Sequence, residues 1–504
     1  MAWPNPFDSL PTELLLKVSS CLPAATDRFR FYTSCRAAHT TEMAAQISNT
    51  LCVDLSSPHS ARRLAHFPPL SKLKKLCVSH SNIEPDAEHA SEFALLALLI
   101  GHLSLPDIQE LYLSEHVRLW DTEESENLMC LLRVACPHLT SLTIADKADH
   151  NYLLRLLAIP GAKGPIHLTS LHLSEGHGAV QFSTLASFLS LKQLTIHCPP
   201  FKRDASQLSK LKHLEDLTLH IQSYSGAPEG LEQVVEGCTQ LTHFRLDGPI
   251  CFTRSFTSHS LRHMVIKEVY GIQCLSRLAM SRLPAIESIT VDQLSIAAVT
   301  GYNPSAFSPQ DLELWRSTAG LLAQKHVRCS GVYISNVEID KLLPLVSSLR
   351  GKLLHATTWF KCDWADIKEP CTLAAFADLL PELRVLELTS CDFQNLDCLS
   401  GVLTEVARMP HLHSLTVCPR LASLRAILPF PSHLVVSESL RCLTFECFDI
   451  KGGVLRMMSE TFPFIQELNF RNCTFAPSMV NEANACFQYL RTPLTCEMAA
   501  LKRR

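Results

Sequence analysis

The sequence predicts an α/β fold in which short parallel strands and return helices alternate many times. A phrase of three apolar residues, separated by two variable residues and then by one, recurs fourteen times in the 504 residues. When one further, decayed copy is counted, the mean step between copies is about 28 residues, which suits a strand plus a helix. Proline stands two residues ahead of the first apolar position in several copies. We therefore expect a long repetitive array in which the phrase forms the strand.

The strands are expected in order along most of the chain. Their central apolar residues are Leu76, Leu111, Leu142, Leu171, Leu194, Leu217, Phe244, Met264, Ile289, Val332, Leu386, Leu415, Leu443 and Leu468. Two steps, of 43 and 54 residues, are longer than the others. A decayed copy at Leu353, Ala356 and Thr358 would divide the second of them into 24 and 30 residues.

The stretches between the strands are expected to be helices that proline brings to an end, because its fixed φ and missing N–H favour an extended chain. The prolines ahead of strand phrases are Pro106, Pro137, Pro284, Pro381, Pro410 and Pro463. Helical i, i+3, i+4, i+7 spacing is found in Leu231, Val234, Val235 and Cys238, and in Leu399, Val402, Leu403 and Val406. Each unit is therefore predicted to be strand, turn, helix and turn.

Over roughly residues 49–475 these features resemble leucine-rich repeats of the ribonuclease-inhibitor-like type. Cys391 and Cys473 stand three residues after the last apolar residue of a phrase, where that family places an Asn or Cys that ties the turn. Other copies depart from this, with Ser81, His116, Gly176, Pro199 and Arg420 at the position. The resemblance implies a solenoid with parallel strands on its concave face and helices on its convex face.

Two segments fall outside the repeat pattern. Residues 299–328 read as an insertion that contains a helix, capped by Ser308 and running through Leu312, Trp315 and Leu322. Residues 476–504 are expected to form a cap over the last repeat and a solvated basic tail.

Residues 1–48 read as a small helical domain. Leu10-Pro11 opens a helix with several aliphatic residues near one face, Pro23 closes it, and a second helix carries Phe29 and Cys35. The segment resembles an F-box, on the residues Leu10, Pro11, Glu13, Leu14, Leu15, Val18, Leu22, Pro23, Asp27, Cys35 and Arg36. Ser19, Ser34 and His39 depart from the family phrase. The alternative is an ordinary amphipathic helix that caps the first repeat.

Composition and missing motifs exclude several function classes. With 45 Lys and Arg against 49 Asp and Glu, a net charge of -4 disfavours a general nucleic-acid binder. Neither a signal peptide nor a long apolar segment is visible, and 21 cysteines without a C-x-x-C pair favour reduced thiols in the cytoplasm or nucleus. Phosphate-binding loops, zinc-protease motifs and nucleophile elbows are absent. We therefore expect no enzyme activity and no membrane, metal or cofactor binding, and interpret His197-Cys198 as accidental neighbours.

The two resemblances together imply a non-catalytic substrate receptor of an SCF-type ubiquitin ligase. The F-box would bind a Skp-type adaptor and through it a cullin scaffold, while the repeats would bind the target protein. The residues implied at the adaptor interface are Leu10, Pro11, Glu13, Leu14, Leu15, Val18, Leu22 and Pro23. A repeat scaffold that binds partners without any ligase role is the alternative.

The target surface follows from the repeat geometry, because residues between and just after the apolar positions of a strand face away from the core. The target-facing residues expected on this concave face are Tyr112, His172, Thr218, His220, Arg245, Asp247, Lys267, Asp292, Glu387, Thr389, Glu446, Asn469 and Arg471. Their mixed charge suits a protein or peptide partner better than a polyanion.

Overall fold

The computed structural model describes a large part of the 504-residue chain. The described residues are 50–54, 74–79, 108–113, 136–145, 167–174, 181–198, 205–221, 229–250, 252–297, 309–335, 339, 343, 346–347, 354, 356–369, 373, 375, 378–393, 395–420, 426–427, 435–451, 453–474, 476 and 478–492. The chain forms two compact units, Met1–Gly248 and Pro249–Arg504.

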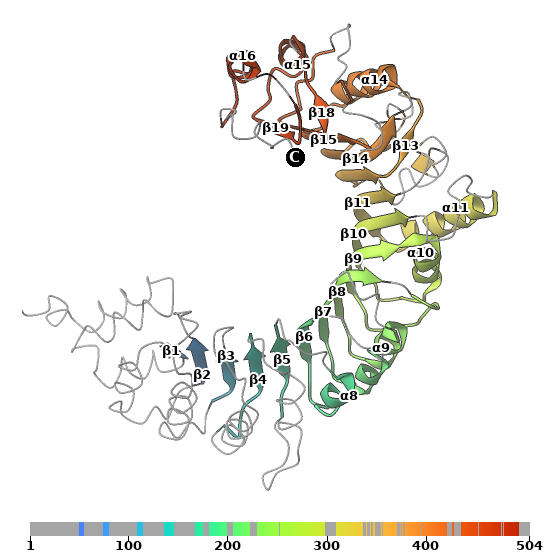
Figure 1. Cartoon of the computed structure of the whole chain (residues 1–504). Helices are drawn as coiled ribbons and strands as arrows, with labels where there is room; N and C mark the ends of the chain where they lie inside the picture. Colours follow the sequence, from blue (N-terminus) through green and yellow to red (C-terminus); the bar gives the residue numbers. More distant parts are fainter. Residues whose placement is uncertain are drawn as a thin grey trace, which may run out of the picture. The chain divides into compact units, whose positions relative to one another are not determined.

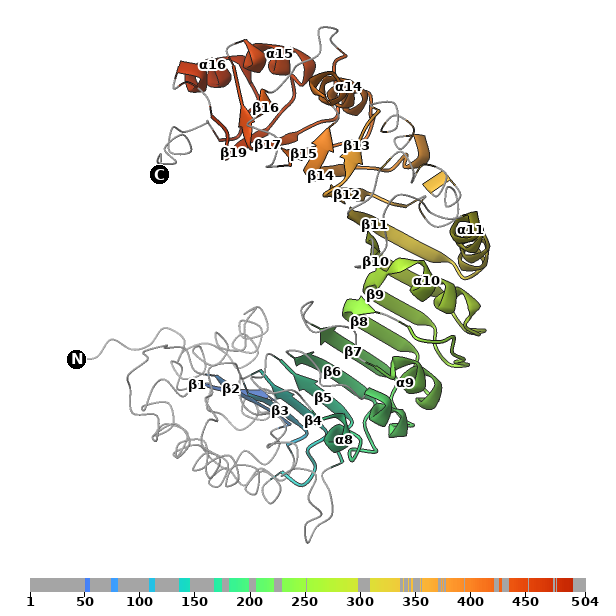
Figure 2. The same cartoon turned by 45° about the vertical axis from the view of Figure 1, so that its right-hand side comes forward.

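The first unit is built on parallel strands in chain order. These are β1 (Thr50–Asp54), β2 (Lys75–Ser79), β3 (Glu110–Leu113), β4 (Ser141–Ile144), β5 (Ser170–Leu173), β6 (Gln193–Cys198) and β7 (Asp216–Ile221), and β7 pairs with the start of β8 (His243–Ile250). Helix α8 (Phe182–Leu185), the 3-10 helix η3 (Ala205–Lys210) and α9 (Leu231–Gly237) follow β5, β6 and β7. The labelled helices α8 and α9 lie on one face of these strands (Figure 1, Figure 2).

The register of the first unit follows the apolar phrase. Leu142 pairs with Leu171, Leu171 with Leu194, and Leu194 with Leu217. The central residues from Leu76 to Phe244 are each at most 2% exposed. The repeat read from the sequence is therefore confirmed in this unit. β1 is an additional strand, which pairs with β2.

The second unit repeats the same plan with longer strands. They are β9 (His263–Tyr270), β10 (Ser288–Ala297), β11 (Val327–Ser335), β12 (Trp359–Asp363), β13 (Asp366–Ile367), β14 (Val385–Phe393), β15 (Ser414–Pro419), β16 (Ala426–Ile427), β17 (Cys442–Glu446), β18 (Phe448–Asp449) and β19 (Glu467–Arg471). The helices whose bounds lie within the described residues of this unit are α10 (Gly271–Met280), α11 (Pro309–Gln324), α14 (Leu396–Ala407), α15 (Val454–Thr461) and α16 (Ser478–Cys486). Within this unit the helices again cover one face of the strands (Figure 2).

β10 and β11 carry two levels of core residues. At the first level Met264 pairs with Ile289, and Ile289 pairs with Val327. At the second level, five residues further along β10 and β11, Leu294 pairs with Val332, and Val332 pairs with Phe360 of β12. The long step of 43 residues in the sequence therefore joins residues of two different levels.

The decayed copy proposed at Leu353, Ala356 and Thr358 was assigned the wrong register. The strand is Trp359–Asp363, and its core positions are Thr357, Phe360 and Cys362, which are 0 to 1% exposed. Phe360 pairs with Val332 on one side and with Leu386 on the other, which divides the 54-residue step into 28 and 26. Thr and Cys replace aliphatic residues here, so the apolar phrase is hidden in the sequence.

The predicted helices that lie within the described residues are present, and α9 and α14 bury the expected faces. Leu399, Val402, Leu403 and Val406 of α14 are at most 1% exposed, and so are Val234, Val235 and Cys238 at α9. The predicted helix of the insertion is α11, which lies beside α10. Lys325, just after α11, donates to the carbonyl oxygens of Leu278 and Ser281 near the end of α10.

Buried thiols bind the carbonyl groups of neighbouring repeats. Cys391 Sγ lies 3.7 Å from the carbonyl oxygen of Cys362, and Cys473 Sγ lies 3.4 Å from that of Phe445. This confirms the turn-tying role expected for these two cysteines. Cys238 Sγ donates likewise to Leu208 O at 3.3 Å. Burial raises the pKa of Cys391 and Cys238 to about 12 and that of Cys473 to about 11, so the groups remain thiols.

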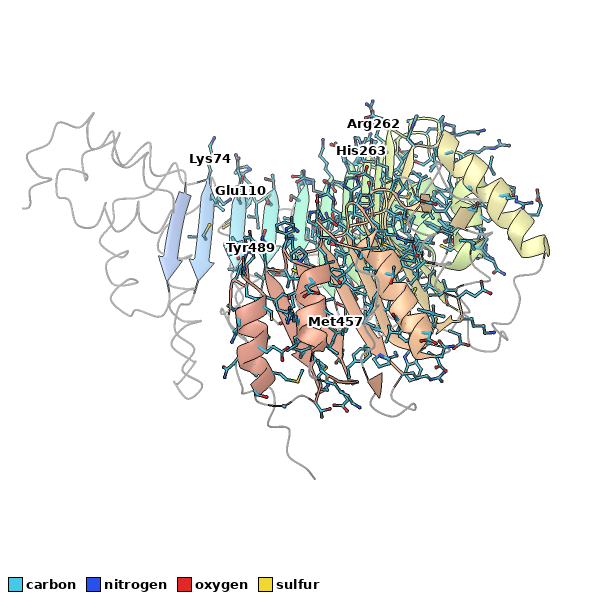
Figure 3. The ribbon with its side chains drawn as sticks, turned by 90° about the horizontal axis from the view of Figure 1, so that it is seen from above. Lys74, Glu110, Arg262, His263, Met457 and Tyr489 are labelled. Atoms are coloured by element: carbon cyan, nitrogen blue, oxygen red, sulfur yellow. The ribbon has the colours of Figure 1, made fainter. Side chains whose placement is uncertain are left out.

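The strand beginnings are linked by backbone hydrogen bonds that step from one repeat to the next. Glu110 N donates to Lys74 O at 2.9 Å, and Lys75 forms an ion pair with Glu110 at 3.0 Å. Figure 3 shows Lys74 and Glu110 at the amino-terminal ends of neighbouring strands. A second ion pair of this kind joins Arg262 Nη1, just before β9, to Glu287 Oε1, just before β10, at 3.0 Å.

The strands, helices and register described above form the α/β leucine-rich-repeat solenoid that the sequence predicts.

Candidate functional site

The predicted adaptor-binding residues, Leu10 to Pro23, lie outside the described residues. The predicted target-facing residues lie within them, on the sheet face opposite the helices, which we call the open face. All of those residues are exposed or half-buried at strand positions that alternate with the core. Tyr112 of β3 is 38% exposed and pairs with Thr143 of β4. The open face is therefore the candidate site in each unit.

Three histidines stack on the open face of the first unit. The ring centroids of His197 and His220 are 3.5 Å apart with an interplanar angle of 19°, and His172 lies 5.2 Å from His197. At the other end Asp247 accepts from His220 Nδ1 at 2.7 Å and from Arg245 Nε at 2.9 Å. Four predicted residues thus form one cluster with His197: His172, His220, Arg245 and Asp247. The sequence interpretation of His197 as an accidental neighbour of Cys198 did not predict this role.

The stack disfavours protonation at its centre. Burial, together with repulsion from His220 and His172, lowers the pKa of His197 to about 4, against an opposing attraction to Asp247. Burial also lowers the pKa of His172. At neutral pH the two rings are therefore neutral, and the stack forms a half-buried aromatic surface with one anchored carboxylate at its end.

This geometry predicts that the first unit loses stability in acid partly through His197. In the unfolded chain His197 takes up a proton near pH 6.5, whereas in the folded chain it does so only near pH 4. The contribution of His197 to the free energy of unfolding is therefore fully present above pH 6.5 and is lost as the pH falls from 6.5 to 4. His197→Gln should reduce the drop in thermal midpoint between pH 7 and 4.5 by roughly 2–4 °C, the shift caused by about 1 kcal/mol, once the pKa difference is discounted for the solvent screening of this half-buried ring. Thermal melts at several pH values measure this.

The matched control is His138→Gln, which changes an exposed histidine in the turn before β4. It leaves the three stacked rings in place and should keep the parent's pH dependence. Equal slopes for His197→Gln and the parent would show that the stack does not couple protonation to folding.

In the second unit the predicted Glu387 lies in a cluster of polar and aromatic side chains. Trp359 Nε1 donates to Glu387 Oε1 at 3.3 Å, and Lys361 Nζ lies 3.4 Å from Glu387 Oε2. Thr389, also predicted, donates to Asp363 Oδ1 at 3.3 Å. Tyr333 OH donates to Asp363 Oδ2 at 3.3 Å.

Sequence reasoning missed the second open-face level of β9 to β12. Its members are Glu268, Tyr270, Gln293, Ser295, Tyr333, Trp359, Lys361 and Asp363. A signal existed in the apolar residues Val269 and Leu294, which continue the strand pattern beyond the three-residue phrase and are fully buried. The predicted Lys267 and Asp292 are exposed between the two levels.

The remaining predicted residues lie on the last strands of the second unit. Glu446 of β17 stands opposite Arg471 of β19, and Asn469 stands opposite Thr444. Thr218 of the first unit stands between Thr195 and Arg245 on neighbouring strands. These side chains belong to the same open faces but are separate from the two clusters above.

Two further properties concern only the described part of the chain. No group of three or more His, Cys, Asp or Glu side chains there is arranged to hold a metal ion. None of the helices described is both long enough and apolar enough to cross a membrane.

Comparisons with known proteins find similarity among solved structures alone. No protein-family model and no curated protein sequence matches the chain. A leucine-rich-repeat protein of Leptospira interrogans matches with 13% identity and a TM-score of 0.35, over 85% of this chain and 92% of that chain.

Two plant receptors are similar at the same low level. The leucine-rich-repeat ectodomain of the Arabidopsis thaliana receptor kinase GASSHO1/SCHENGEN3, in complex with CASPARIAN STRIP INTEGRITY FACTOR 2, matches with 13% identity and a TM-score of 0.29, over 84% of this chain and 59% of that one. A plant peptide hormone receptor in complex with RGF2 matches with 12% identity and a TM-score of 0.29, over 81% and 64% of the two chains. The fold of this chain is established by its own strands, which pair in parallel from one repeat to the next with their core residues opposite each other, as in leucine-rich repeats.

Proposed function

We propose that the chain is the non-catalytic substrate-recognition subunit of an SCF-type ubiquitin ligase. In this proposal residues 1–48 bind a Skp-type adaptor, which connects the chain to a cullin scaffold, and the open face of the repeats binds the target protein. The chain itself performs no bond chemistry. It raises the effective concentration of a target lysine near an activated ubiquitin.

The observation that supports the ligase role is a sequence phrase in its context. Leu10, Pro11, Glu13 and Leu14 follow the F-box phrase, and a leucine-rich-repeat array comes directly after that segment. The target-binding role is supported by the open faces, which present Tyr112 at 38% exposure and Tyr270 at 41%. Exposed aromatic residues beside charged ones are typical of protein interfaces. The proposal places the protein in the cytoplasm or nucleus.

Truncation tests this proposal. A fragment that starts near Leu51 should melt cooperatively, because the strands and helices described above follow that point, yet it should not co-purify with a Skp-type adaptor. The full chain, expressed with the adaptor under the same conditions, is the control. A fragment that retained the adaptor as well as the full chain does would disprove the F-box assignment. A full chain that failed to co-purify would leave the repeat scaffold without a ligase role.

A further inference from the structure

An aromatic ring lies across the open face of the second unit. A Cβ atom added to Gly331 of β11 would come within 2.4 Å of Trp359 Cε3 and 3.1 Å of Trp359 Cζ3, so the indole occupies the space above the glycine. On the opposite side its Nε1 donates to Glu387 of β14. The half-exposed ring is therefore held in place between two neighbouring strands before any partner arrives.

Two half-buried carboxylates on the same open face, Glu268 of β9 and Asp363 of β12, accept hydrogen bonds from neutral donors. Glu268 Oε1 accepts from Gln293 Nε2 at 2.8 Å and from Ser295 Oγ at 2.5 Å. Tyr270 also bonds to Glu268, and burial together with that carboxylate raises the tyrosine pKa to about 12. The neutral donors of Asp363 are Tyr333 and Thr389.

The described residues supply no cation to either carboxylate. Lys361, which shares the strand of Asp363, forms its ion pair with Glu387 at 3.4 Å. No Lys, Arg or His nitrogen in the described ranges lies within 4.0 Å of Glu268 or Asp363. A partly desolvated carboxylate that meets only neutral donors still favours a positive charge, because such hydrogen bonds leave its net charge in place.

We propose that the open face of β9 to β14 binds a basic, extended segment of the target protein. One Lys or Arg stacks on the Trp359 ring, and further basic side chains pair with Glu268 and Asp363. Cation–π contact is strongest with tryptophan, and a ring already held by neighbours loses little entropy on binding. This inference deepens the target-binding part of the proposed function and rests on it, but it is independent of residues 1–48.

The strand register sets the spacing of the basic residues. Glu268, Gln293, Gly331 and Trp359 stand in one row across four neighbouring strands. Because the indole extends from Trp359 over Gly331, the ring lies between two and three strand spacings from Glu268. This distance of about 10–14 Å is spanned by three or four residues of an extended peptide, and of these only residues four apart face the same side. The target segment should therefore carry Lys or Arg at positions i and i+4.

Selection from a random-sequence peptide library displayed on phage tests this on the full chain. Selected peptides should be enriched in Lys and Arg with four-residue spacing. In titrations with one synthetic selected peptide, Glu268→Gln and Asp363→Asn should each weaken binding about fivefold to tenfold, as expected when a charged hydrogen-bond partner becomes neutral. Trp359→Leu should weaken it by a similar factor, and added salt should weaken binding to the parent chain.

The control is Glu382→Gln, which neutralises an exposed carboxylate in the turn before β14, outside the open face. Its affinity for the peptide should equal that of the parent. Thermal midpoints within about 2 °C of the parent show that the isosteric Gln and Asn variants remain folded. Selection of acidic or purely apolar peptides, or equal binding by the four variants, would overturn the inference while adaptor binding stayed intact. Loss of adaptor co-purification with basic-peptide binding retained would instead overturn the ligase role alone.

Discussion

Replacing Leu10 and Leu14 together by Ala should weaken binding to a Skp-type adaptor by about two to four powers of ten. The F-box resemblance implies that both side chains are buried in the adaptor interface. A fully buried Leu contributes about 1.5–3 kcal/mol, and each 1.4 kcal/mol corresponds to about tenfold in affinity. Calorimetric titration of the purified adaptor into the parent and the variant measures the change.

The thermal midpoint, measured alongside, separates this expectation from its rival. If residues 1–48 only cap the first repeat, the same double substitution should lower the melting temperature. Lys17→Ala, in the same predicted helix, is a matched control that should leave both quantities near the parent's values. A destabilised variant with adaptor affinity unchanged would exclude the ligase role.

Replacing Phe360 by Ala should destabilise the second unit by about 3–5 kcal/mol, the cost typical of removing a fully buried aromatic ring. Phe360 is 1% exposed and lies between Val332 and Leu386 in the core row. In a domain of this size the loss corresponds to a fall of roughly 6–20 °C in thermal midpoint. Denaturation followed by circular dichroism measures it.

The adjacent residue provides the control for Phe360. Lys361→Ala changes an open-face side chain of the same strand, whose half-exposed ion pair with Glu387 should contribute at most about 1 kcal/mol. In the register first read from the sequence, Ala356 would be the central core residue and Phe360 would lie outside the phrase. A small effect of Phe360→Ala would therefore contradict the strand assignment of β12.

The strands of this fold were predictable because burial repeats with a fixed local spacing. Leu142, Leu171, Leu194 and Leu217 carry the apolar phrase, and each pairs with the next. β12 was placed in the wrong register because Thr357 and Cys362 fill core positions without being large aliphatic residues. A search for Leu and Ile spacing does not detect such substitutions.

The open-face clusters were less predictable because their members meet across strands. His197 and His220 stack although 23 residues separate them, and Glu268 meets Ser295 from 27 residues away. Local spacing predicts that such side chains leave the core. Only the register between neighbouring strands determines which of them become partners. The position of His172, Arg245 and Glu387 between two apolar residues correctly predicted that they lie on the open face. It did not predict that they form clusters with His197 or Trp359.

The buried cysteine thiols can report local unfolding of the repeats in which they lie. Cys136 and Cys238 lie in the first unit, and Cys329, Cys391 and Cys473 lie at separate repeats of the second, all of them buried. A protonated, buried thiol does not react with alkylating reagents until its surroundings open. The modification rate of each cysteine, read by mass spectrometry, therefore reports the opening equilibrium of its own repeat. In a repeat protein, where stability is approximately a sum of neighbouring contributions, these rates would map stability along the chain without any introduced probe.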